Sequence, residues 1–172
     1  MKHDEFIRQA NLLENYVEKY KAKTSQYVRK WFKLEGNILS YSLRERLDAR
    51  SSAFVDSNLV FTEKDPNSLT LAFTFLNQSG KRKNWKLKFA SVAEYTEWNK
   101  ALCISRRPIW DPESVLKCVE CDRNFTFFRR QHHCRNCGRV VCGDHSENRF
   151  LLEDLAYDEP VRVCDTCTKK LS

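Results

Sequence analysis

The chain has 172 residues, enough for one or two domains, and carries 30 Lys and Arg against 23 Asp and Glu, a formal net charge of +7. It has no apolar run of about 18 residues, which excludes a transmembrane helix of ordinary length. The polar N-terminus, MKHDEFIRQANLLENY, lacks the apolar core of a secretory signal. We therefore expect the protein in the cytoplasm, where clustered cysteines more often bind metal than form disulfides.

The positive charge lies in the N-terminal part of the chain. Residues 1–107 carry 20 Lys and Arg against 12 Asp and Glu, whereas residues 108–172 carry 10 against 11. Such a distribution is typical either of a solvated basic surface or of a domain that meets an anionic partner, such as a membrane surface or nucleic acid.

The segment 12–104 has the pattern of a small β domain closed by a helix. Apolar and polar residues alternate in several stretches, and turn residues at Gly36-Asn37 and Ser79-Gly80 separate them: 27–36, 37–42, 68–75 and 84–90. We predict about seven strands in a barrel or sandwich, an α+β but mainly β fold.

A helical period follows in residues 91–103. Its apolar face comprises Val92, Tyr95, Trp98 and Leu102. Ser91 and Glu94 have the spacing of a capping box at its start. We expect Trp31 and Trp98 in the core and interpret Cys103 as a buried helix residue.

The remaining seven cysteines lie in residues 118–167 and, with His145, form four pairs with two residues between the ligands. These pairs are Cys118/Cys121, Cys134/Cys137, Cys142/His145 and Cys164/Cys167. Eight such ligands complete two closed tetrahedral zinc sites of the structural type, with no open catalytic position. Consecutive and interleaved combinations of the four pairs both fit the spacing.

The stretch RRQHHCRNCG (129–138) concentrates positive charge around two of the cysteines. His132 and His133 are not needed as zinc ligands, so they and the neighbouring arginines are available for another role. Arginine forks suit phosphate recognition, and histidine adds a further donor. We expect a small phosphorylated ligand here; the alternative is a basic face that offsets the zinc thiolates.

These residues resemble the FYVE zinc finger over residues 108–172. RQHHCRNCG (130–138) is similar to the family signature, RVC (162–164) to its R-V-C element, and WDPE (110–113) to its W-x-x-D element. The resemblance implies interleaved pairing, with one zinc on Cys118, Cys121, Cys142 and His145 and the other on Cys134, Cys137, Cys164 and Cys167.

The resemblance also implies a ligand, the headgroup of phosphatidylinositol 3-phosphate on endosomal membranes. The implied headgroup contacts are Arg130, His132, His133, Arg135, Arg162 and Glu113. Phe127 and Phe128 occupy the place where FYVE domains carry an apolar loop that enters the bilayer. The sequence departs from the family pattern at Gln131, Glu113 and His145, which replace a basic residue, an aspartate and a cysteine.

Residues 12–104 resemble the pleckstrin homology (PH) domain. The strand–turn–strand segment 16–42 and Trp98 in the last helix carry this resemblance. Lys19 matches the basic residue that lipid-binding members have in the first strand. Residues 28–30, Val-Arg-Lys, do not match their [KR]-x-R element. We therefore expect non-specific attraction of anionic lipid by the basic residues Lys19, Lys21, Lys23, Arg29 and Lys30. A short linker, 105–112, stiffened by prolines, is expected between the domains, with Trp110 already part of the FYVE motif.

Together these features predict a non-enzymatic adaptor, similar to the Phafin-type PH–FYVE proteins, that lies peripherally on early endosomes or related vesicles. Its expected partners are phosphatidylinositol 3-phosphate and an anionic membrane surface. A FYVE-related module that binds protein instead of lipid, and the lipid-binding end of a larger signalling protein such as a Rho-type exchange factor, are alternatives. A RING-type ubiquitin ligase module would leave RQHHCR unexplained, and no base-reading element supports nucleic-acid binding.

Overall fold

The computed structural model describes residues 12–77 and 79–172, which form two compact units that meet in sequence between Arg106 and Arg107. The N-terminal unit contains β1 (Leu12–Lys21), β2 (Gln26–Glu35), β3 (Ile38–Ser42), β4 (Ser51–Phe54), β5 (Val60–Asp65), β6 (Thr70–Leu76), β7 (Arg82–Lys88) and α2 (Val92–Ser105). No helix among the described residues is both long and apolar enough to cross a membrane.

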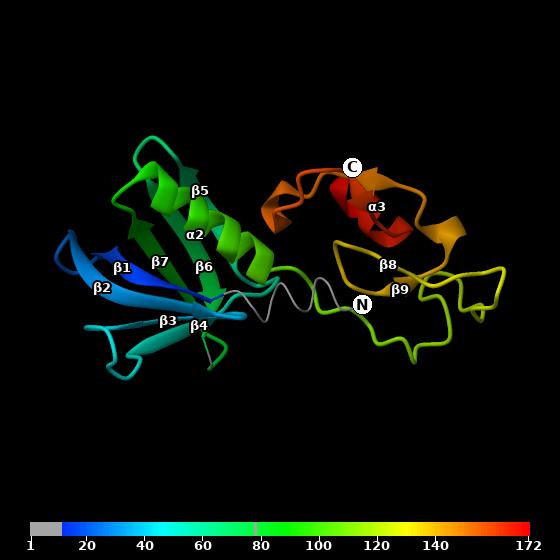
Figure 1. The fold of residues 1–172 in the computed structure, drawn as a ribbon, viewed down its shortest axis with the longest axis horizontal. Coiled ribbons are helices and arrows are strands. Elements are labelled where there is room, and N and C mark those ends of the chain that lie inside the picture. Colours follow the sequence, from blue (N-terminus) through cyan, green and yellow to red (C-terminus); the bar gives the residue numbers. More distant parts are fainter. Residues whose placement is uncertain (1–11, 78) are drawn as a thin grey trace. The chain divides into compact units, whose positions relative to one another are not determined.

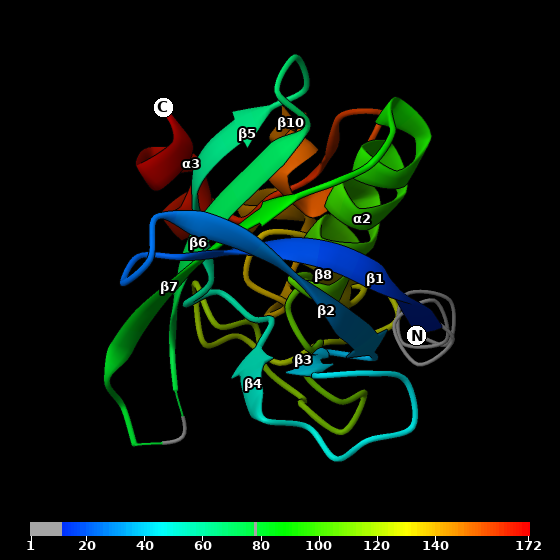
Figure 2. The ribbon, with the colours of Figure 1, turned by 90° about the vertical axis from the view of Figure 1, so that its left-hand side faces the viewer.

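The seven strands form one antiparallel sheet in the order β4-β3-β2-β1-β7-β6-β5. Figure 2 shows the long β1 and β2 running together across the sheet, and Figure 1 shows α2 lying beside β5 and β6. The prediction of a mainly β, seven-stranded domain that ends in a helix is confirmed.

Alternation along the strands fills the interior of this unit. Phe32 and Leu34 of β2, together with Phe73 and Phe75 of β6, point inward and are almost fully buried. Helix α2 contributes Trp98, whose side chain is 0% exposed and packs on this cluster. The predicted core position of Trp98 and the buried position of Cys103 are both observed.

Trp31, which was expected in the core, and Val92, which was expected on the apolar face of the helix, are not buried. Trp31 is only half-buried and lies opposite Tyr16 of β1, with ring centroids 4.9 Å apart, because Phe32 takes the inward position of this alternating strand. The buried tryptophan of the sheet is instead Trp85 in β7. Val92 is 65% exposed because it begins the first turn of α2, before the helix reaches the core.

The start of α2 follows the predicted capping pattern with one difference. The Ser91 hydroxyl accepts a hydrogen bond from the Glu94 backbone N–H at 3.2 Å. The Glu94 carboxylate, however, accepts from the backbone N–H of Ala90 at 2.8 Å, one residue before the cap. Its second oxygen accepts from the Asn15 amide at 2.8 Å, which ties the helix to β1.

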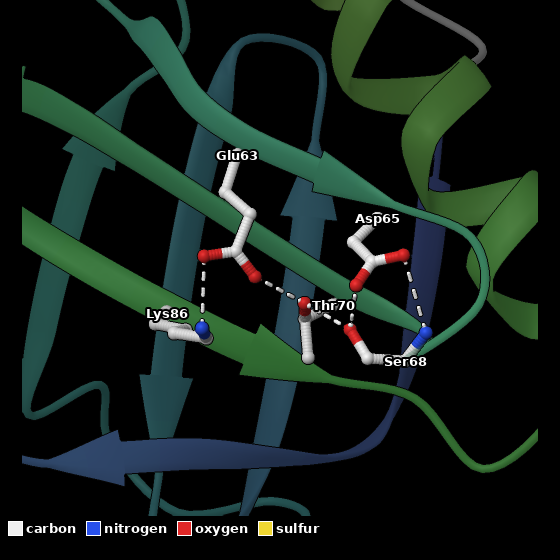
Figure 3. Close-up of polar contacts among 5 residues, drawn as sticks. All are labelled: Glu63, Asp65, Ser68, Thr70 and Lys86. Atoms are coloured by element: carbon white, nitrogen blue, oxygen red, sulfur yellow. Dashed lines mark hydrogen bonds and ion pairs between the residues drawn. The ribbon is translucent and has the colours of Figure 1, made fainter.

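A polar network joins β5, β6 and β7 next to a bulge in β5 (Figure 3). Glu63 forms an ion pair with Lys86 at 2.8 Å and also accepts a hydrogen bond from the buried hydroxyl of Thr70. Asp65 accepts from the hydroxyl and backbone N–H of Ser68 and so closes the β5–β6 turn. The network satisfies the buried Thr70 and fixes the register of the three strands.

The C-terminal unit is built from short elements. These are β8 (His132–His133), β9 (Val140–Val141), η1 (Gly143–His145), β10 (Arg149–Phe150), η2 (Glu153–Leu155), β11 (Val161–Arg162) and α3 (Asp165–Leu171). Two small antiparallel pairs, β8 with β9 and β10 with β11, are its only sheets among the described residues.

The predicted linker, residues 105–112, is distributed between the two units. Ser105 ends α2, and its hydroxyl donates to the Gly36 carbonyl at 2.7 Å within the N-terminal unit. Arg107 belongs to the C-terminal unit, where its guanidinium donates to the carbonyl oxygens of Leu155 and Ala156 at 2.9 and 2.8 Å.

Candidate zinc centres and headgroup site

The C-terminal unit has almost no apolar core of its own. Apart from cysteines, the buried apolar side chains among residues 107–172 are Val140, Val141, Leu152 and Val163. Most of the other fully buried side chains are thiols, five of which are at most 3% exposed. A unit of this size with so little apolar burial needs a cross-link or a metal to fold.

Eight side chains form two groups of four potential ligands, which are Cys118, Cys121, Cys142 and His145 in one group and Cys134, Cys137, Cys164 and Cys167 in the other. Within each group the ligand atoms all lie within 4.8 Å of one another. These are the groups of the interleaved combination, so each joins segments that are distant in sequence. All cysteines are free, and the sulfurs of Cys137 and Cys164 are 4.0 Å apart, too far for a disulfide bond.

The chemistry of both groups suits a divalent cation. Burial raises the pKa of Cys142 to about 11 and that of Cys164 to about 12. A hydrogen bond from the Cys137 thiol instead lowers the pKa of Cys134 to about 5. Crowded thiols of this kind cannot all ionise unless a positive ion offsets their mutual repulsion. Tetrahedral sets of four cysteines, or of three cysteines and one histidine, are the ligands that structural zinc prefers.

Gly138 closes the turn that holds Cys134 and Cys137. Its φ is +80°, and a Cβ atom at this position would lie 2.2 Å from the Ile109 carbonyl oxygen. The turn is held by a hydrogen bond from the Gly138 N–H to the Cys134 carbonyl at 2.8 Å. The segment that leads into the WDPE element therefore packs directly against the zinc turn.

Replacing Gly138 with Ala is expected to destabilise the C-terminal unit. The left-handed backbone alone costs about 1–2 kcal/mol for a residue with a Cβ atom, and the clash with Ile109 adds to it. Thermal unfolding at saturating zinc measures the effect. Gly143→Ala is the control, since the atom nearest to its added Cβ would be His132 Nε2 at 3.9 Å. Equal melting temperatures for the two variants would contradict the role of Gly138.

The basic motif begins at a loop with two exposed aromatic rings. Phe127 is 81% exposed and Phe128 is 94% exposed, and their rings contact each other edge to face at 5.3 Å. Phe125 is instead half-buried and packs in the core of the unit. The loop is closed by two hydrogen bonds between the backbones of Thr126 and Arg129, at 3.0 and 3.1 Å.

A cleft of about 340 Å³ lies between this loop and η1. Phe128, Arg130 and His132 line it, together with Thr126, Arg129, Gly143 and Asp144. Burial lowers the pKa of His132, and the charges of the nearby arginines lower it further. The cleft therefore combines exposed apolar, cationic and donor groups.

The other predicted headgroup residues lie on neighbouring segments. Because successive residues of a strand point to opposite faces, His133 is turned from His132 and stacks on Trp110 at 4.6 Å. Arg135 lies over the same indole at 4.4 Å and donates to the His133 carbonyl at 2.7 Å. The backbone N–H of Arg135 donates to the Arg162 carbonyl at 2.9 Å, so these two arginines are neighbours.

The acidic residue that borders the cleft is not the one that the sequence predicted. Glu113 is exposed and does not line the cleft, whereas Asp144, which no motif marks, does. Asp111 has a structural role, since its carboxylate accepts from the Val140 N–H at 3.0 Å. Gln131 donates to the Val115 carbonyl at 2.7 Å and so anchors the basic strand instead of supplying charge.

In the N-terminal unit, Lys19 lies in β1, the central strand of the sheet. Its ammonium is 5.5 Å from the Tyr41 ring and 5.7 Å from the Trp85 ring. Burial, and then the charges of Lys21 and Lys30, lower its pKa. A separate cleft of about 600 Å³ beside the β1–β2 turn is lined by Lys19, Lys21, Lys23 and Lys86 among other residues. Three of the five basic residues that were expected to form a patch therefore line this cleft. Lys86, which was not predicted, lines it as well.

Comparisons with known proteins identify the C-terminal unit. Residues 109–172 match the family model of the FYVE zinc finger and belong to that family. The two four-ligand groups are therefore its two zinc sites. The chain carries this finger after a PH-type domain of seven antiparallel strands and a closing helix.

Two named relatives each match part of the chain. The zebrafish (Danio rerio) pleckstrin homology domain-containing family F member 2 is 36% identical over 107 residues, 52% of this chain and 43% of that protein. Vacuolar protein sorting-associated protein 27 of Saccharomyces cerevisiae is 52% identical over 50 residues, 29% of this chain and 8% of that protein. A solved Slm1 PH domain in complex with D-myo-inositol-4-phosphate gives a TM-score of 0.47 at 18% identity, covering 55% of this chain and 94% of that chain. The chain spans less than half the length of these two curated relatives.

Proposed function

We propose that the protein is a phosphoinositide-binding adaptor of endosomal membranes, in which the FYVE finger binds the headgroup of phosphatidylinositol 3-phosphate. The observation that carries this proposal is the cleft beside the exposed loop, where Arg130 and His132 adjoin Phe128. A phosphate at this place would meet cationic donors while the aromatic rings enter the acyl region of the same leaflet. The PH-type domain assists through the charge of its lysine-rich cleft.

The chemistry of the site supports binding and gives no support to catalysis. Both metal groups are complete with protein ligands, so no position for an activated water remains. The residues that we assign to the headgroup are Arg130, His132, Arg135 and Arg162, with His133 and Glu113 at its edge. The exposed loop and the headgroup residues act as two weak anchors that together hold the protein at a membrane.

Stereospecific binding is tested with soluble headgroups. Calorimetric titration should give higher affinity for inositol 1,3-bisphosphate than for the 1,4- and 1,5-isomers, because arginines at fixed positions recognise where the phosphate lies on the ring. Equal affinities for the three isomers would contradict the assignment to the 3-phosphate and would favour a non-specific anionic surface.

Replacing both Phe127 and Phe128 with Ser is expected to weaken vesicle binding at least tenfold and to leave the affinity for the soluble headgroup unchanged. Burial of each ring in the bilayer contributes roughly 1.5–3 kcal/mol, and both side chains are exposed, Phe127 at 81% and Phe128 at 94%. Leu171→Ser, at an exposed apolar residue outside the loop, is the control. An equal loss of both kinds of binding would show that the loop has a structural role instead.

A further inference from the structure

Two arginines of the finger lie opposite each other although like charges on a sheet repel. Arg149 in β10 and Arg162 in β11 are register partners of an antiparallel pair. Both guanidinium groups turn to the same acceptor, the Ser146 carbonyl oxygen, at 3.4 Å from Arg149 and 2.8 Å from Arg162. Directly opposed like charges destabilise a sheet, so this pair costs folding free energy.

A third arginine extends the pair into a row. The backbone of Arg135 is hydrogen-bonded to that of Arg162, so Arg135, Arg162 and Arg149 belong to three adjacent segments. None of the ion pairs found among residues 12–77 and 79–172 involves any of the three.

The row contains more positive charge than a single phosphate group needs. Arg135 and Arg162 alone provide two guanidinium forks, which suffice for one phosphate. Arg149 lies on the far side of Arg162 and is exposed, so its fork is available to a ligand. A repulsive row without an acidic partner is stabilised when an anion with more than one negative centre binds along it.

We propose that Arg149 extends the headgroup site and binds a second phosphate group, next to the phosphate held by Arg135 and Arg162. This inference rests on the proposed function and makes Arg149 a residue that determines specificity. The second phosphate belongs either to the same inositol ring or to a neighbouring anionic lipid. Both sources present the same chemistry to the guanidinium, and they can be separated by experiment.

The test compares wild type with Arg149→Gln, and Arg139→Gln serves as the control because it removes the same charge from an exposed arginine outside the row. Calorimetry with inositol 1,3-bisphosphate, and with the 1,3,4- and 1,3,5-trisphosphates, measures the contribution of a second ring phosphate. Vesicles of phosphatidylcholine with phosphatidylinositol 3-phosphate, with and without phosphatidylserine, measure the contribution of a neighbouring lipid.

We expect Arg149→Gln to lose about tenfold in affinity for a trisphosphate, or in phosphatidylserine-enhanced vesicle binding, and less than about twofold for inositol 1,3-bisphosphate. A loss of affinity for the trisphosphate would mean that the second phosphate belongs to the inositol ring. A loss of phosphatidylserine-enhanced binding would mean that it belongs to a neighbouring lipid. An equal loss for all probes, or no loss for any, would overturn the proposal while leaving the proposed function intact. If the wild type binds none of the inositol phosphates or vesicles, both the role of Arg149 and the proposed function are contradicted.

Ligand-free stability provides an independent measurement. Because Arg149 repels Arg162, the Arg149→Gln variant with both zincs bound should melt at the same temperature as wild type or higher. A lower melting temperature for Arg149→Gln than for Arg139→Gln would mean that the bond to Ser146 is a structural contact, and it would contradict a role in ligand binding.

Discussion

Removal of zinc by a strong chelator is expected to unfold the C-terminal unit and to leave the N-terminal unit folded. Structural zinc contributes roughly 10–16 kcal/mol to a small finger, which exceeds anything that the four buried aliphatic side chains of this unit can supply. The N-terminal unit has its own apolar core around Phe32, Phe73 and Trp98 and offers no metal group among its described residues.

Circular dichroism and proteolysis before and after chelation measure this difference. Digestion should remove residues 107–172 and spare a fragment that ends near Arg106, and chelator presaturated with zinc should have no effect. Metal analysis should find two zinc ions in the wild type and in Cys103→Ala, and fewer in Cys134→Ala. A melting curve that does not change with chelator would refute the dependence of the fold on metal.

Arg135→Ala is expected to reduce the affinity for the soluble 3-phosphorylated headgroup by about 10- to 100-fold. Hydrogen bonds to a charged partner contribute roughly 1.5–3 kcal/mol each, and every 1.4 kcal/mol corresponds to about tenfold in affinity. Arg135 is held in place by the Trp110 ring and by its bond to the His133 carbonyl, so its fork is preorganised for the ligand.

The matched control for this variant is Arg139→Ala, which removes the same charge from the same zinc turn. It should bind the headgroup almost as well as wild type, because Arg139 is exposed and lies outside the cleft and the arginine row. Both variants should retain two zinc ions, which excludes misfolding as the cause. Similar losses in the two variants would mean that the finger attracts the headgroup by net charge alone.

The sequence predicted those features that depend on local pattern. Strand alternation located β2, β3, β6 and β7, and cysteine spacing identified the eight residues that form the two four-ligand groups, because both signals lie within a few residues. Trp31 was placed wrongly, since hydrophobicity alone does not tell which of two adjacent aromatic residues, Trp31 or Phe32, points inward. The prediction was right for Trp98, where the helical period leaves a single buried face.

The parts of the site that escaped prediction depend on contacts distant in sequence. Asp144 belongs to no motif, and it lines the cleft only because η1 borders it. Arg149, which we propose as an extension of the site, also belongs to no motif and lies beside Arg162 only because β10 pairs with β11. The interleaved grouping of the four ligand pairs, by contrast, was predicted, but only through the resemblance to FYVE fingers, because spacing permits two combinations and only the folded chain brings Cys118 next to Cys142. The role of Gln131 as an anchor was also invisible, since its partner lies sixteen residues away.

Sedimentation with liposomes that differ only in which monophosphoinositide they contain tests the central claim most directly. The wild-type protein should pellet selectively with phosphatidylinositol 3-phosphate, and Arg135→Ala should lose this selectivity while Arg139→Ala keeps it. Equal binding to all the anionic liposomes, unaffected by Arg135→Ala, would contradict the proposed 3-phosphate site and would assign membrane binding to the basic PH-type domain.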